Sequence, residues 1–276
     1  MVPQIRPRQR DAFIVVRNLR VLTIGGYIRY RALFGWLNPT MYVLTLLVPS
    51  LTQLFFFVYL GRAAHVENDA FFVAGNALVA AATPSLFGMS QAIAGERYTQ
   101  TLSLLIVSPA NRVALFLGRS LPAIANGIVI SVWTLGISAV IFSVHIPARA
   151  LAPLALTIAV SAFACVGLGL FNASLGLRWR ETAVLGNVFL YLLLLFAGIN
   201  IPLDRLPGWL STMAQGLPLT HGARAARELI GGASLGHVSG LLAAEALVGL
   251  SYTAVGLAAL RFFEIEARRG AALEVA

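Results

Sequence analysis

Long apolar runs separated by short polar stretches dominate the chain. Each of six runs is close to or above the about 20 residues with which a helix crosses the ~30 Å hydrocarbon core of a bilayer. The runs cover residues 36–60, 71–94, 121–144, 151–177, 182–201 and 241–263. This pattern predicts an all-α integral membrane protein that forms a single domain over residues 1–276, with six transmembrane helices over residues 36–263. Residues 1–35 are then a cytoplasmic or interfacial N-terminus, and residues 264–276 a cytoplasmic tail.

The composition supports membrane insertion and excludes a soluble protein. Of the 276 residues, 58% are hydrophobic and only 11% are charged, whereas soluble domains carry about 25% charged residues. The mean hydropathy is +0.82. Cys165 is the single cysteine, so no intramolecular disulfide can form.

The basic residues indicate how the chain is oriented. All 20 are arginines, and a cytoplasmic N-terminus places 15 of them inside and 5 outside. Because cytoplasmic loops are enriched in basic residues, both termini are predicted to be cytoplasmic. We therefore interpret the net charge of +9 as an orientation signal and expect no nucleic-acid partner. The absence of lysine excludes a phosphate-binding P-loop from these residues.

Residues 10–22, which precede the first apolar run, have the spacing of an amphipathic helix. Arg10, Arg17 and Arg20 gather on one face of a helical wheel, and apolar side chains gather on the other. An arginine-bearing amphipathic helix beside a membrane is typical of an interfacial helix that lies against anionic lipid headgroups. Alternatively, these arginines only set the topology.

The predicted cytoplasmic link between the second and third runs also has amphipathic spacing. Tyr98, Leu102 and Leu105 share one face of a helix, whereas Glu96 and Gln100 lie on the opposite face. The residue before a proline disfavours helix, so Pro109 ends the element. Such a helix, joined directly to two spans, can dock against a partner and transmit its movement. From the spacing alone, a helix that rests on the bilayer is an equal alternative.

The predicted outer segment between the fifth and sixth runs is apolar but interrupted by proline and glycine. Residues 201–210 contain Pro202, Pro207, Gly208 and Trp209, and further breaks follow up to residue 219. We expect short, broken helices that enter the outer interface, with Trp209 at the level of the headgroups.

Few polar side chains fall inside the predicted spans. Glu245 is the only acid there, near the outer end of the sixth span, where snorkelling or pairing would neutralise it. Asn76, Asn126, Asn172 and Asn187 are expected to hydrogen-bond neighbouring helices. An ion-coupled secondary transporter, which places acids near the midplane, is therefore a less favoured alternative.

A membrane enzyme would need a carboxylate or histidine cluster, so we expect no catalytic, cofactor-binding or metal-binding residues on this chain.

The cytoplasmic link resembles a motif of the ABC-2 family of ATP-binding-cassette exporter permeases, which serve drug resistance, nodulation-factor export and polysaccharide export. The family pattern after the second span is Glu-Arg-x-x-Gly-Thr-Leu-Glu-x-Leu-Leu-x-Ser-Pro. In this chain Gln100 replaces the glycine of the pattern and Ser103 its second glutamate. The matching residues are Glu96, Arg97, Thr101, Leu102, Leu105, Ser108 and Pro109.

This resemblance implies a permease that lies in a bacterial plasma (inner) membrane and dimerises. It also implies a partner, a separate nucleotide-binding ATPase subunit that holds ATP and magnesium. The segment 96–107 would be the coupling helix that contacts this subunit, through Glu96, Arg97, Tyr98, Thr99, Gln100, Thr101, Leu102 and Leu105. The substrate path would run along the interface between protomers, with an aromatic lining from spans one and five. Its candidates are Phe55, Phe56, Tyr59, Phe189, Tyr191 and Phe196. A drug-like substrate is favoured over a polysaccharide or lipid-linked glycan, because the cytosolic loops are short and carry no glycan-binding appendage.

Overall fold

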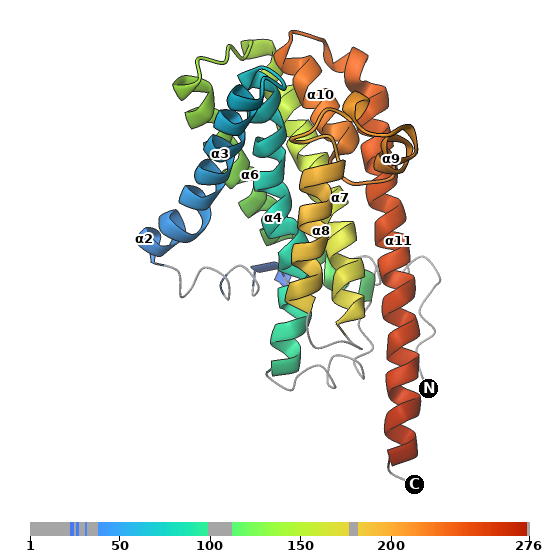
Figure 1. Ribbon diagram of the computed structural model, residues 1–276. Helices are drawn as coiled ribbons and strands as arrows, with labels where there is room; N and C mark the ends of the chain where they lie inside the picture. Colours follow the sequence, from blue (N-terminus) through green and yellow to red (C-terminus); the bar gives the residue numbers. More distant parts are fainter. Residues whose placement is uncertain are drawn as a thin grey trace, which may run out of the picture.

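The computed structural model describes residues 38–98, 112–176 and 182–274, together with 23–24, 26–27 and 31. Every regular element in this part of the chain is helical (Figure 1). The longer helices are α3 (Val48–Ala64), α4 (Asp69–Tyr98), α6 (Arg112–Ile141), α7 (Leu151–Leu175), α8 (Thr182–Phe196) and α11 (Leu235–Glu274). The shorter ones are α2 (Pro39–Tyr42), the π-helix η1 (Val43–Leu47), the 3-10 helices η2 (Ala148–Ala150) and η3 (Leu203–Arg205), α9 (Gly208–Ala214) and α10 (Thr220–Ile230).

Within the described residues, five helical stretches are long and apolar enough to cross a membrane. They cover Pro39–Ala64, Asp69–Gln91, Ser120–Ile141, Ala148–Leu175 and Leu235–Phe263. The fifth of the six predicted spans corresponds to α8, which has 15 residues. At a rise of 1.5 Å per residue, such a helix covers about 22 Å, less than the ~30 Å hydrocarbon core. The prediction of an all-helical membrane domain is confirmed, whereas a membrane crossing by α8, the fifth predicted span, stays a prediction.

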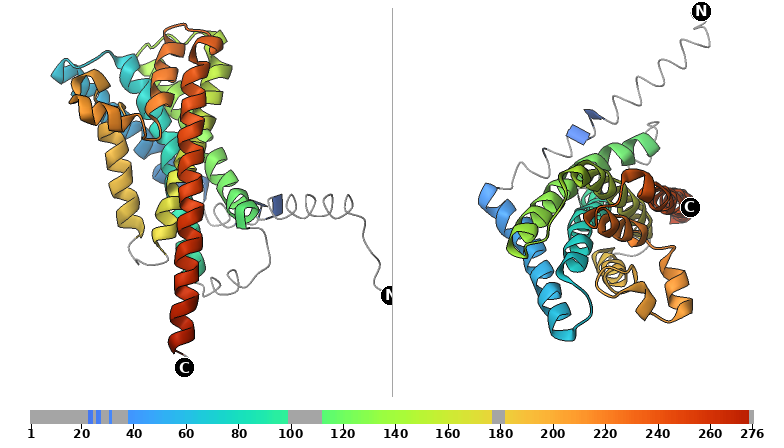
Figure 2. Two further views of the ribbon diagram at one scale, coloured as in Figure 1. Left: turned by 90° about the vertical axis from the view of Figure 1, so that its right-hand side faces the viewer. Right: turned by 90° about the horizontal axis from the view of Figure 1, so that it is seen from above.

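Helices α4 and α7 form the centre of the bundle. Within their apolar stretches, 72% of α4 and 67% of the stretch that contains α7 are buried, against 17% of the stretch that contains α3. Seen from above, α4 lies between α3 and α8 (Figure 2). Leu54 of α3, Leu86 of α4 and Leu193 of α8 are buried in the same hydrophobic core. The outer helices thus position their side chains against a fixed central pair.

Helices α7 and α11 approach closely because small residues face each other. A Cβ atom added to Gly249 would lie 2.7 Å from the Cα of Ala164. One added to Gly167 would lie 2.6 Å from the main-chain oxygen of Gly249. In a bilayer, where apolar surface is not hidden from water by association, such small residues allow the close packing that joins helices.

Helix α11 continues well past the predicted sixth span. It runs without interruption from Leu235 to Glu274 over 40 residues, which is about 60 Å at 1.5 Å per residue. Figure 1 shows its C-terminal end extending beyond the rest of the bundle. The apolar part of this helix ends at Phe263, as predicted for the sixth span, and residues 264–274 extend the same helix beyond it. These residues include charged ones. The helix can still continue through them, because its main-chain hydrogen bonds form in water as well as in lipid.

Candidate functional site

The aromatic side chains predicted to line a substrate path lie on two separate helices. Phe56 and Tyr59 of α3 are 62% and 59% exposed, and Tyr191 of α8 is 61% exposed. Phe55 instead packs edge-on against Phe142, with 5.3 Å between ring centroids. Phe189 and Phe196 of α8 are half-buried. Because α4 separates α3 from α8 (Figure 2), the two sets do not form one lining within a protomer. A shared path at an interface between protomers stays a prediction.

The predicted coupling segment begins on the last turn of α4. This helix includes the main chain of Glu96, Arg97 and Tyr98. The remaining coupling candidates, Thr99, Gln100, Thr101, Leu102 and Leu105, lie outside the described residues, as do Arg10, Arg17 and Arg20 of the predicted interfacial helix. The described start of the segment, residues 96–98, is therefore part of a helix that also crosses the centre of the bundle.

Glu245, the single acid predicted within a span, is completely buried and receives two main-chain hydrogen bonds. Its exposed fraction is 0%. Oε1 accepts a bond of 2.7 Å from the N–H of Leu219, and Oε2 one of 3.1 Å from the N–H of Gly222. Leu219 directly precedes α10 and Gly222 lies in its first turn, where the helix dipole favours a negative charge. Of the two alternatives stated for Glu245, snorkelling or pairing, the structure favours a paired side chain, because the start of α10 lies beside it and satisfies its carboxylate with main-chain N–H groups.

Arg227 fixes the opposite end of α10. Its Nη2 donates to the main-chain oxygens of Gly198 (2.8 Å) and Ile199 (2.9 Å), and its Nε donates to that of Phe71 (3.3 Å). The guanidinium carbon also lies 3.5 Å from the centre of the Phe71 ring. Burial lowers the pKa of Arg227, and the Glu67 carboxylate offsets part of this effect. A guanidinium nevertheless remains charged at physiological pH, so Arg227 links α10 to the start of α4 and to the chain after α8.

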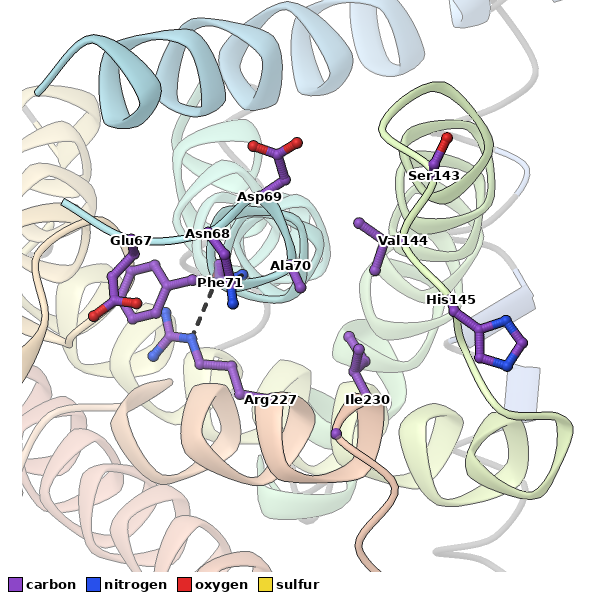
Figure 3. Close-up of a pocket in the computed structure, with 11 residues that line it drawn as sticks. Glu67, Asn68, Asp69, Ala70, Phe71, Ser143, Val144, His145, Arg227 and Ile230 are labelled. Atoms are coloured by element: carbon purple, nitrogen blue, oxygen red, sulfur yellow. Dashed lines mark hydrogen bonds between the residues drawn. The ribbon is translucent and has the colours of Figure 1, made fainter. Parts of the chain in front are cut away.

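Arg227 also borders a cavity of about 790 Å³. Its other walls come from residues 67–71, at the start of α4, and residues 143–145, after α6. Figure 3 shows the Arg227 side chain reaching from α10 towards Phe71 and Glu67. On the opposite rim, Asp69 accepts a hydrogen bond of 2.9 Å from Nε of Arg62. The charged groups around this cavity thus tie helices together.

Three of the four asparagines expected to join helices do so. Asn76 of α4 accepts a long bond from Nε2 of Gln53 on α3 (3.5 Å) and donates to Oδ1 of Asn200 after α8 (2.9 Å). Asn172 of α7 donates to Oγ of Ser90 on α4 (2.7 Å). Asn126 of α6 accepts a bond of 2.5 Å from the Tyr42 hydroxyl.

The fourth asparagine, Asn187, differs from this expectation. It is exposed on α8 and donates to the main-chain oxygen of Ala183 on its own helix (3.0 Å). Sequence reasoning placed Arg227 among the outer arginines but did not find its role, because its partners are main-chain oxygens, which have no sequence signature.

The bundle, its apolar spans and the helix that is tied at both ends define a multi-pass membrane protein whose polar groups join helices. A family model described as ABC-2 type transporter matches residues 28–230, and the chain belongs to this family. It is also similar to a probable multidrug ABC transporter permease, YbhR, from two strains of Escherichia coli. Identity to either is 29% over 133 residues, which are 48% of this chain and 36% of the relative. The matched stretch thus covers little more than a third of these curated relatives.

Proposed function

We propose that this chain is the membrane permease subunit of an ATP-binding-cassette exporter and moves an amphipathic or hydrophobic drug-like compound out of the cytoplasm. The observation that carries the proposal is the family match over residues 28–230. A drug-like substrate is supported by the similarity to a probable multidrug permease. Export of a polysaccharide or lipid-linked glycan by the same machinery is the alternative.

In this proposal, the energy comes from another subunit. The chain contains no lysine, and a P-loop needs one to reach the nucleotide phosphates. ATP and magnesium therefore bind a separate nucleotide-binding subunit, and segment 96–107 receives its movement. Closure of that subunit shifts a two-state equilibrium between conformations of the membrane domain. Two copies of the permease assemble in the plasma (inner) membrane with both termini in the cytoplasm.

The proposal is tested by isolating the full chain from native membranes and measuring transport. We expect a P-loop ATPase to co-purify, and inside-out vesicles that contain both proteins to accumulate daunorubicin only when ATP is supplied. Vesicles whose ATPase carries a substituted P-loop lysine are the control and should not accumulate the drug. Transport by the isolated chain in an ion gradient without nucleotide would overturn the proposal.

A further inference from the structure

A small pocket with several polar groups in a mainly apolar lining opens between η1, α3, α4 and α6, within stretches that are apolar enough to span a membrane. Its volume is about 110 Å³. Asn76 and Ala80, in its floor, are 2% and 6% exposed, whereas Thr45 and Pro49 are exposed at its mouth. Since a water molecule occupies about 30 Å³ of the liquid, the pocket can hold a few waters or one polar group of a larger molecule.

The hydroxyl groups that line this pocket already use their hydrogens. Thr45 donates to the main-chain oxygen of Met41 (2.6 Å) and Thr83 to that of Val79 (2.9 Å). The Ser50 hydroxyl contacts the main-chain oxygen three residues earlier (2.8 Å) and Oγ1 of Thr134 (2.9 Å), and it uses its one hydrogen between them, since the Thr134 hydroxyl donates to Ile130 (2.8 Å). Each hydroxyl oxygen has two lone pairs, so these side chains offer acceptors to a bound group and no further O–H donor.

The side-chain amide of Asn76, in the floor of the pocket, also has no free N–H donor. Both N–H groups of Asn76 are used, one by the main-chain oxygen of Phe72 (3.0 Å) and one by Oδ1 of Asn200 (2.9 Å). Its Oδ1 faces Nε2 of Gln53 at 3.5 Å, which is a long hydrogen bond. Among the lining residues, Gln53 is thus the side chain that keeps donor capacity.

Two prolines in the lining add main-chain acceptors. Pro84 lies inside α4 and has no N–H, so the carbonyl of Ala80 loses its helical donor. Pro49 follows the π-helix Val43–Leu47, where the N–H of Val48 bonds five residues back to Val43. Proline again supplies no donor to the preceding turn. Single π-turns inside α-helices are frequent at functional sites.

From this arrangement we infer that the pocket is a substrate subsite that binds an uncharged hydrogen-bond donor, a hydroxyl or N–H group, of an amphipathic molecule. Its lining offers many oxygen acceptors and no acidic side chain, which suits a neutral donor. Acceptors without a hydrogen-bond partner cost free energy in an apolar environment. A donor group that enters the pocket therefore gains hydrogen bonds that it cannot form in the lipid. This inference rests on the proposed function, because it identifies the ligand with the exported substrate.

The test compares two probes that share one apolar body, pyrenebutanol and its methyl ether, of which only the alcohol has an O–H donor. Their dissociation constants are measured on the full chain in phosphatidylcholine nanodiscs, by energy transfer from its four tryptophans. The variant Pro84→Ala supplies the missing N–H to Ala80, and Thr83→Val removes one hydroxyl acceptor. Pro122→Ala is the matched control, because Pro122 lies inside α6 and outside the pocket lining.

We expect the preference for the alcohol over the ether to be about fivefold greater in the unmodified chain than in Pro84→Ala or Thr83→Val, and unchanged in Pro122→Ala. The partitioning of each probe into lipid is the same for every variant, so it cancels when the ratios of the two dissociation constants are compared between variants. Equal preference in the unmodified chain and in both pocket variants would overturn the inference and indicate that the pocket holds water only. If Pro84→Ala does not fold, Thr83→Val decides. Because no nucleotide or ATPase takes part, a negative result leaves ATP-driven export untouched.

Discussion

Glu245 of α11 accepts a hydrogen bond of 2.7 Å from the main-chain N–H of Leu219, which lies 26 residues earlier and directly before α10. Leu219 has a φ of 73°, in the left-handed region. That conformation costs an L-residue about 1–2 kcal/mol, and the buried carboxylate stabilises it. The link thereby joins the start of α10 to the helix that crosses the membrane next.

Glu245→Gln tests this link. The amide keeps the shape of the carboxylate but has only one acceptor oxygen, so one main-chain N–H is left without a partner. We expect a loss of about 1–3 kcal/mol of unfolding free energy, measured as a lower Tm in detergent. Glu228→Gln on α10 is the control, since Glu228 is partly exposed and contacts His237 at 3.5 Å; its Tm should hardly change. Equal effects in the two variants would contradict the role of Glu245.

Arg227→Lys tests the attachment of the other end of α10. The ammonium of lysine lacks the planar fork with which arginine reaches several oxygens at once, so the bonds to Gly198, Ile199 and Phe71 cannot all be kept. We expect a loss of about 1–3 kcal/mol in stability. The control Arg224→Lys, on the exposed face of the same helix, should leave Tm unchanged. A stable Arg227→Lys protein would show that the attachment does not need the guanidinium.

Gly249→Leu tests the close packing of α7 and α11. The new side chain meets the Cα of Ala164, so the helices must separate or distort, at a cost of about 1–3 kcal/mol. Gly136→Leu in α6 is the matched control, because a Cβ atom there has no neighbour within 4 Å. Thermal unfolding of both variants in the same detergent gives the comparison. No difference between them would exclude a packing role for Gly249.

The double variant Glu96→Ala with Arg97→Ala tests the coupling proposal. We expect ATP-dependent export to fall at least tenfold while the amount of protein in the membrane and its Tm stay unchanged, since transmission is lost and the fold is not. Arg224→Ala, which lies away from segment 96–107 in the sequence, should export normally. Full export by the double variant would remove the coupling assignment.

Ala64→Cys tests the orientation in the membrane. Ala64 is exposed at the end of α3, whereas the native Cys165 is buried and should not react. A membrane-impermeant maleimide should therefore label the variant on intact cells and leave the unmodified protein unlabelled. Labelling only after permeabilisation would reverse the predicted topology.

The number of long apolar helices could largely be predicted because insertion into lipid depends on a local sum over about 20 consecutive residues. The asparagine links could be predicted in part, since an amide inside a span needs a partner. The pattern did not identify that partner. Asn76 joins α4 to Asn200, whereas Asn187 bonds within α8.

The sequence by itself determined that this is an all-helical membrane protein with arginines concentrated in its predicted cytoplasmic segments, because hydropathy and charge act on each segment independently. The tertiary structure decided that α11 continues to Glu274, that Glu245 binds the start of α10 and that Arg227 holds its end. These features depend on main-chain groups that every residue carries. Packing alone determines which of those groups meet a charged side chain.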